Sequence, residues 1–222
     1  MKWEDKLTLL LCIVSDLQAI HSKNIIHRDL HSGNILQNSL NSAYIADLGL
    51  SITSNITLKV ESSGVYGILP YIAPEILSGK QYTTASDIYS FGIIMWEILY
   101  GKSVFYNQQF GSQFQLEICN NNLRPIIIKN TPQYYINLMK KCWDKDPEKR
   151  PSAANICEIF TEWQINEKIL LDLSESEEIL KDIESMNFPV YPKTMYTSKP
   201  IYYTNSFCKD SKLYSLAVKD NI

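Results

Sequence analysis

The chain has 222 residues, of which 45% are hydrophobic and 20% are charged, and its formal net charge is −3. This length and composition predict a globular fold with a sizeable core and argue against a disordered chain. The slightly acidic balance gives no reason to expect nucleic acid or an anionic membrane as partner. Five scattered cysteines without a CxxC pair favour a reducing compartment, so we expect a cytoplasmic protein. The longest apolar stretch, residues 88–100, is shorter than the ~18 residues of a membrane span.

The distribution of apolar and polar residues along the first half of the chain predicts a helix, a hairpin and a loop. Leucine, isoleucine and valine recur at helical spacing from Glu4 to His21, which predicts an amphipathic helix. Two short apolar runs, residues 34–36 and 43–46, flank a polar stretch and predict a small hairpin. Residues 50–66 are rich in Ser, Thr and Gly without periodicity, which predicts an exposed, adjustable loop.

The second half of the chain is predicted to form several helices packed around one buried helix. Residues 86–100 are apolar nearly all round a helix and stop at Gly101, so this helix should lie in the centre of the domain. Further amphipathic helices are predicted at about residues 112–120, 132–143 and 152–164. The predicted fold class is therefore mainly α with a small β-hairpin, an α+β arrangement.

The character of the sequence changes near residue 165. Residues 174–178 are acidic, and three prolines then interrupt any regular element. We therefore expect residues 165–222 to form a tail with one weak helix and an otherwise extended or partly disordered course. Its tyrosines, which either form a docking or phosphorylation segment or belong to a passive tail, are Tyr191, Tyr196, Tyr202 and Tyr203.

Three side chains of the first half suit phosphoryl transfer. Asp29 and Asn34 lie five residues apart in a loop that enters the predicted hairpin, and Asp47 leaves its far strand. Because the hairpin returns the chain to its start, we expect both carboxylates and the amide to converge at the open end of the hairpin, which is called the mouth below. Phosphoryl transfer needs a carboxylate that orients the attacking hydroxyl and hard oxygen ligands that hold Mg²⁺ on the phosphates. Asp29 suits the first task, and Asn34 and Asp47 suit the second.

These residues belong to a series of motifs that resembles the C-terminal lobe of the eukaryotic protein kinases. His27-Arg28-Asp29 with Asn34 is similar to the catalytic loop HRDxxxxN, and Asp47-Leu48-Gly49 stands where kinases carry DFG. The other matching segments are Ala73-Pro74-Glu75 for APE, Asp87 with the apolar helix after it, and residues 142–144 and 146–151, which resemble a late-helix signature common in tyrosine and tyrosine-kinase-like kinases.

The resemblance implies a division of the chain and a set of roles. Residues 1–164 would form the C-terminal lobe, with the catalytic loop at 27–34 and the activation segment at 47–75. It implies ATP and Mg²⁺ as cofactors and a protein as substrate or regulator. The implied site residues are Asp29, His31 and Asn34 for catalysis, Asn34, Leu36 and Asp47 for the cofactor, and Asn34 and Asp47 for the metal. It also implies a buried ion pair between Glu75 and Arg150, and an Asp87 that braces the catalytic loop.

The sequence also departs from the family pattern. No GxGxxG occurs in the 222 residues, and too few residues precede the first helix for an N-terminal lobe, so little or no kinase activity is expected of this chain alone. His31 replaces the lysine and Ile68 the threonine usual in Ser/Thr kinases. Leu48 replaces the DFG phenylalanine and should keep an apolar plug. The closing helices favour the tyrosine-kinase-like group, and hence Ser/Thr over Tyr as acceptor.

Three hypotheses follow for the chain. It is the catalytic lobe of a kinase, a non-catalytic pseudokinase-like module that docks substrates or regulators through residues 113–119, or a decayed fragment with an exposed apolar floor at Ile35 and Leu36. His27 is expected to be structural. Arg28 is either a surface charge or the receptor of a phosphorylated loop residue, for which the candidates are Thr53, Ser54, Thr57, Ser62, Ser63 and Tyr66.

Overall fold

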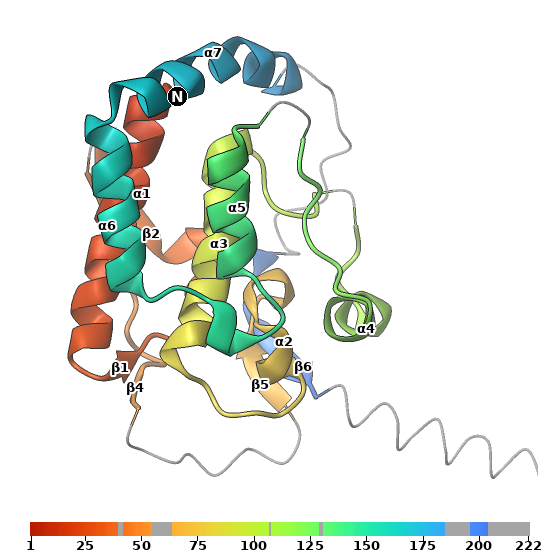
Figure 1. The fold of residues 1–222 in the computed structure, drawn as a ribbon. Helices are drawn as coiled ribbons and strands as arrows, with labels where there is room; N and C mark the ends of the chain where they lie inside the picture. Colours follow the sequence, from red (N-terminus) through yellow and green to blue (C-terminus); the bar gives the residue numbers. More distant parts are fainter. Residues whose placement is uncertain (40–41, 55–63, 107, 129–130, 185–195, 204–222) are drawn as a thin grey trace, which may run out of the picture.

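The computed structural model describes residues 1–39, 42–54, 64–106, 108–128, 131–184 and 196–203. Within this part of the chain the fold is mainly helical, as predicted, with three two-stranded antiparallel sheets (Figure 1). The helices are α1 (Trp3–Ser22), α2 (Pro74–Leu77), α3 (Thr84–Tyr100), α4 (Ser112–Asn120), α5 (Gln133–Cys142), α6 (Ala153–Ile165) and α7 (Glu167–Glu184). The strands are β1 (Ile25–Ile26), β2 (Ile35–Ser39), β3 (Ser42–Ile45), β4 (Ile52–Thr53), β5 (Gly64–Gly67) and β6 (Lys199–Tyr202).

Helix α3 is the centre of the core, as its apolar sequence predicts. Its residues 86–96 are all buried, and it ends where Gly101 adopts the left-handed conformation that glycine tolerates best. It packs against α5 so closely that a Cβ atom on Gly92 would lie 2.8 Å from the Cβ of Cys142. Glycine is therefore required at this crossing, because any larger side chain would push the two helices apart.

Helices α1 and α6 pack side by side along one flank of α3 (Figure 1). The apolar residues predicted to form the inner face of α1 are buried in the core cluster, among them Leu7, Leu10 and Leu17. The helix expected beyond residue 165 is α7, which crosses the start of α1. The indole nitrogen of Trp3 donates a hydrogen bond of 2.9 Å to Ser176 Oγ, so α7 is fastened to the lobe by a buried polar contact.

The predicted hairpin is present as β2 and β3, in which Ile35 pairs with Ile45 and Leu36 with Tyr44. The prediction of an exposed loop over residues 50–66 is wrong at its two ends. Residues 52–53 form β4, which pairs with β1, and residues 64–67 form β5, which pairs with β6 from the tail. Each ladder depends on a partner strand elsewhere in the chain, so the local sequence carries no periodic signal for it.

Some predictions fall outside the described residues, namely those for Thr57, Ser62, Ser63 and Tyr191. No helix in the described part of the chain is long and apolar enough to cross a membrane.

Candidate active site

Asp87, at the start of α3, fixes the backbone of the loop that contains Asp29. Its two carboxylate oxygens accept hydrogen bonds from the backbone N–H groups of His27 (2.8 Å) and Arg28 (3.0 Å). A third contact, of 2.9 Å, joins the carboxylate to His21 Nε2. Asp87 is only 1% exposed, so these donors replace the water that the buried carboxylate has lost. The predicted bracing role of Asp87 is confirmed.

His27 is fully buried and links the loop to the hairpin. Its Nδ1 accepts a hydrogen bond of 3.3 Å from the Asp29 N–H, and its Nε2 lies 3.1 Å from the carbonyl oxygen of Ala46. Because Nδ1 accepts, the neutral ring carries its proton on Nε2 and donates it to Ala46. His27 therefore serves the structure, as expected, and holds Asp29 at a fixed distance from the end of β3.

The predicted catalytic and metal positions are brought together at the open end of the β2–β3 hairpin. Asn34 Nδ2 donates to the carbonyl oxygen of Asp29 (2.8 Å), and the Asn34 carbonyl accepts from the Ala46 N–H (2.8 Å). The second contact places Asp47, the next residue, beside Asn34. Asp47 adopts a positive φ of 61°, and its Oδ1 accepts from the Gly49 N–H at 3.1 Å. The open end of the hairpin therefore brings two segments together, the loop with Asp29 and Asn34 and the residues that follow β3.

His31 lies on the same side of the loop as the Asp29 carboxylate. Its Nδ1 accepts a hydrogen bond of 3.0 Å from the Gly33 N–H and so caps a short 3₁₀ turn at Ser32–Asn34. Its Nε2 is 3.7 Å from Asp29 Oδ2. With Nδ1 occupied as an acceptor, the neutral ring presents an N–H toward Asp29.

Two leucines of the site are exposed. Leu36 is 45% exposed, which agrees with the expectation of an apolar floor open to water. Leu48 is 49% exposed, so the expectation that it forms an apolar plug is wrong. Leu48 follows the positive-φ residue Asp47 just beyond the end of β3. An apolar side chain in that position requires a covering surface before it can act as a plug.

The Arg28 guanidinium makes one hydrogen bond and one ring contact, but one of its N–H donors has no hydrogen-bond partner among the described residues. Arg28 has a positive φ of 72°, its Nη1 donates to the carbonyl oxygen of Leu50 at 3.3 Å, and its guanidinium lies 4.7 Å from the ring centre of Tyr82. Its Nε is buried without a hydrogen-bond partner. A buried donor left unpaired is unusual in proteins, so Arg28 retains capacity for an additional acceptor.

A polar chain that the sequence did not suggest connects the catalytic loop with α3. Tyr71 donates a hydrogen bond of 2.6 Å to Glu97 Oε2 and lies 2.9 Å from Ser32 Oγ, so Ser32 donates to the Tyr71 oxygen. The other oxygen of Glu97 accepts from the Val104 N–H at 2.8 Å. Burial raises the pKa of the Glu97 carboxyl, although the two hydrogen bonds oppose that shift. Tyr71 and Glu97 are far apart in the sequence, and the sequence analysis assigned no role to either.

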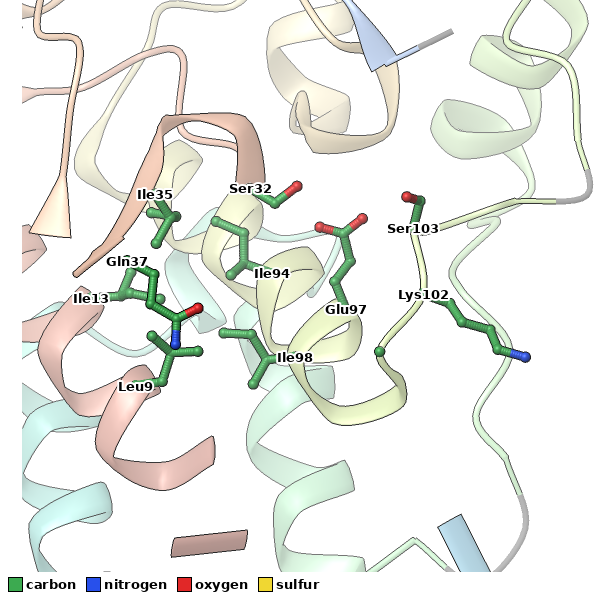
Figure 2. Close-up of a pocket in the computed structure, with 11 residues that line it drawn as sticks. Leu9, Ile13, Ser32, Ile35, Gln37, Ile94, Glu97, Ile98, Lys102 and Ser103 are labelled. Carbon is green, nitrogen blue, oxygen red and sulfur yellow. The ribbon is translucent and has the colours of Figure 1, made fainter. Parts of the chain in front are cut away.

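Ser32 and Glu97 also line a cavity of about 340 Å³ beside the loop. In Figure 2 the Glu97 carboxylate points toward the side on which Ser32 and Ser103 lie, while Leu9 and Ile13 lie at the opposite side. Gln37 lies beside Leu9 and Ile13, and Lys102 also lines the cavity, so its lining combines apolar, polar and oppositely charged side chains.

The segment after β5 is tied to the lobe by a buried ion pair. The Arg150 guanidinium holds the Glu75 carboxylate in two parallel hydrogen bonds of 2.6 and 2.7 Å. The same guanidinium donates to the backbone carbonyls of Asp144 and Ala85. Glu75 and Arg150 are 8% and 7% exposed. The ion pair implied by the resemblance is therefore confirmed, with all parts of the guanidinium engaged.

Comparison with known sequences agrees with this geometry. The sequence model of the protein tyrosine and serine/threonine kinase family matches residues 1–160. The chain belongs to the protein kinase family. Its residues 142–151, which the resemblance assigned to a late-helix signature, lie within the matched range. Loop, hairpin and buried ion pair thus form part of a kinase domain.

Similar kinases occur in Dictyostelium discoideum and Arabidopsis thaliana. The chain is 36% identical over 141 residues to the dual specificity protein kinase shkE of Dictyostelium discoideum, which covers 63% of this chain and 20% of that protein. It is 32% identical over 160 residues to the serine/threonine/tyrosine-protein kinase HT1 of Arabidopsis thaliana, covering 72% of this chain and 40% of that protein. A probable serine/threonine-protein kinase of Dictyostelium discoideum is 33% identical over 155 residues, which are 69% of this chain and 9% of that protein. The kinase chain therefore spans a minor part of these relatives' length.

Proposed function

We propose that this chain supplies the catalytic half of a protein kinase, which transfers the terminal phosphate of ATP to serine or threonine hydroxyls of other proteins. The proposal rests on the position of Asp29, Asn34 and Asp47 together at the mouth. Asp87 and His27 hold the backbone of the loop there through hydrogen bonds. In this proposal the 222 residues have little activity on their own, because they contain no glycine-rich loop to hold the phosphates.

Asp29 is proposed as the residue that receives the proton of the attacking hydroxyl. Its backbone is fixed on both sides, by His27 Nδ1 at its N–H and by Asn34 Nδ2 at its carbonyl. A fixed backbone holds the carboxylate in a constant orientation, which general-base catalysis requires. His31, 3.7 Å from Asp29 Oδ2, is proposed to stabilise negative charge next to it.

Asn34 and Asp47 are proposed as the protein ligands of Mg²⁺, which neutralises charge on the phosphates of bound ATP. The donor set fits this metal, because carboxylate and amide oxygens are hard ligands. The amide nitrogen of Asn34 is engaged by Asp29, which leaves its side-chain oxygen for another partner. Leu36, exposed on β2, is proposed to contact the adenine ring.

The choice of serine or threonine over tyrosine rests on similarity. Of the three relatives described above, one is named a serine/threonine kinase, one a serine/threonine/tyrosine kinase and one a dual specificity kinase, so none of the three is named for tyrosine alone. The assignment to the tyrosine-kinase-like group is proposed from residues 142–151, whose pattern is common in that group.

The proposal is tested by supplying an N-terminal kinase lobe. The chain alone and a fusion of the chain behind the N-terminal lobe of the Arabidopsis relative would be incubated with Mg²⁺, labelled ATP and mixed protein substrates. We expect no transfer above background by the chain alone. In the fusion we expect transfer to Ser/Thr, which Asp29→Asn lowers by ~10²–10⁴-fold, the usual contribution of a positioned base.

A fusion that is folded and binds ATP but transfers no more phosphate than its Asp29→Asn variant would overturn the proposal. Transfer confined to tyrosine would overturn the acceptor assignment. Transfer by the unfused chain, removed by Asp29→Asn, would overturn the proposed dependence on a second lobe.

A further inference from the structure

A strand from the tail covers the edge of the segment that precedes the APE motif. Strand β6 pairs antiparallel with β5, with Val65 opposite Ile201, Tyr66 opposite Pro200 and Gly67 opposite Lys199. Figure 1 shows β6 (blue) beside β5 (orange), close to α2. An exposed strand edge offers unpaired N–H and C=O groups to any extended segment, and here the chain's own tail takes that place.

The edge that β6 covers lies against the catalytic aspartate. A Cβ atom built on Gly67 would be 3.6 Å from Asp29 Oδ1, so the last residue of β5 lies next to the carboxylate proposed as the base. Lys199 of the tail is the pairing partner of that same glycine. An extended protein segment that follows β5 toward Asp29 would therefore need the backbone positions that β6 occupies.

Side-chain contacts at three points hold the tail on this face. Ile201 is only 6% exposed, whereas its neighbour Tyr202 is 60% exposed. The side-chain nitrogen of Gln115, a buried residue of α4, donates a hydrogen bond of 2.7 Å to the Tyr202 carbonyl oxygen. Upstream of β6, the Tyr196 hydroxyl donates to the Val104 carbonyl oxygen at 2.7 Å. The Tyr196 ring packs edge-on against Phe110 with a centroid separation of 5.3 Å.

Pro200 fixes which backbone groups of β5 the tail can satisfy. Proline has no N–H, so the Tyr66–Pro200 pair must be one whose N–H and C=O groups point away from the partner strand. The alternation of an antiparallel ladder then turns Val65 and Gly67 toward β6, and turns Tyr202 away from β5. The outward carbonyl of Tyr202 agrees with this, since it bonds to Gln115. Val65 and Gly67 are thus the residues whose amides β6 protects.

We propose that residues 196–203 are an internal occupant of the β5 edge, and that an external extended peptide binds there only when the tail is displaced. The peptide that fits is one with an apolar side chain at the position of Ile201 and an aromatic one five residues before it. The inference deepens the proposed function, because on that function the external segment is the protein substrate.

The test uses the full chain and a fluorescent peptide with the sequence of residues 196–203. Ile201→Asp and, separately, Tyr196→Ala remove an anchor of the tail, and Tyr202→Asp is the matched control on the exposed side of the same strand. A tethered segment competes at an effective concentration that reaches the millimolar range. We therefore expect the Ile201→Asp and Tyr196→Ala chains to bind the peptide with a Kd at least about tenfold lower than the wild type. Binding to the Tyr202→Asp chain should match the wild type.

Amide hydrogen exchange supplies the second measurement. Exchange at Val65 and Gly67 should accelerate in the Ile201→Asp chain and stay slow in the Tyr202→Asp chain, while the amides of α3 remain protected in both and report an intact fold. Unchanged exchange at these two amides in a folded Ile201→Asp chain would overturn the proposal. So would equal peptide affinity of the wild type and both anchor variants.

Neither measurement requires ATP or phosphate transfer. If the anchor variants expose β5 and bind the peptide but the lobe fusion transfers no phosphate, the tail inference stands and the kinase proposal fails. If transfer occurs but β5 stays protected in every variant, the kinase proposal stands and the tail inference fails.

Discussion

Replacing Arg150 with methionine is expected to lower the free energy of unfolding by about 3–5 kcal/mol. The substitution leaves Glu75 buried without its bidentate partner, and it frees the backbone carbonyls of Asp144 and Ala85 from the donors that they now have. The loss is large because the uncompensated carboxylate cannot reach water. Urea unfolding followed by circular dichroism gives the comparison.

Two further variants control for this effect. Lys149→Met, one residue away, removes an exposed cation whose side chain is 68% accessible, and should change stability by less than about 0.5 kcal/mol. The double variant Glu75→Leu with Arg150→Met removes both charges and should be more stable than Arg150→Met alone. If Arg150→Met costs no more than Lys149→Met, the ion pair does not secure this segment.

Replacing Asp87 with alanine should cost about 2–4 kcal/mol, since each buried donor left unpaired costs about 1–3 kcal/mol. The N–H groups of His27 and Arg28 both lose their acceptor, and His21 loses its carboxylate partner. Because Arg28 has a positive φ, the loop needs this brace to keep its conformation. Thermal and urea unfolding would measure the loss.

Asp87→Asn separates charge from shape at the same position. It keeps one acceptor oxygen and nearly the same volume, so it should lose about half as much as Asp87→Ala. Amide exchange at His27 and Arg28 should rise in both variants. A stable Asp87→Ala chain with protected His27 and Arg28 amides would contradict the bracing role.

Most of the longer helices were predictable because an apolar face, or in α3 an apolar sequence all round, extends over two or more turns, whereas the one-turn helix α2 was not predicted. Helix α4 occupies the predicted residues 112–120, and α3 stops where Gly101 required it to stop. The approach of Asp47 to Asn34 was predictable because a hairpin returns the chain to the neighbourhood of its start. The local sequence was sufficient to predict those elements that depend on contacts between residues close together along the chain.

The features missed depend on contacts between distant segments. Strands β5 and β6 have four residues each, and their pairing joins residues on either side of most of the lobe. Leu48 was expected to form an apolar plug because it stands in place of the DFG phenylalanine, but burial depends on a covering surface that the motif does not reveal. The Ser32–Tyr71–Glu97 chain likewise arises from the packing of α3 against the loop, and no spacing in the sequence signals it.

The most direct test of the central claim, that Asn34 and Asp47 form the metal side of a phosphotransfer site, is a titration of the isotopically labelled chain with Mn²⁺ and ATP, followed by NMR. Mn²⁺ prefers the same oxygen ligands as Mg²⁺, and its unpaired electrons broaden nearby signals even when binding is weak. We predict that the amide signals of Asn34, Asp47 and Gly49 broaden first. This selectivity should be lost in Asp47→Asn and kept in Asp172→Asn, a control on the exposed side of α7. Uniform broadening, or equal broadening at Asn34 and Gly49 with and without the Asp47 carboxylate, would contradict the assignment.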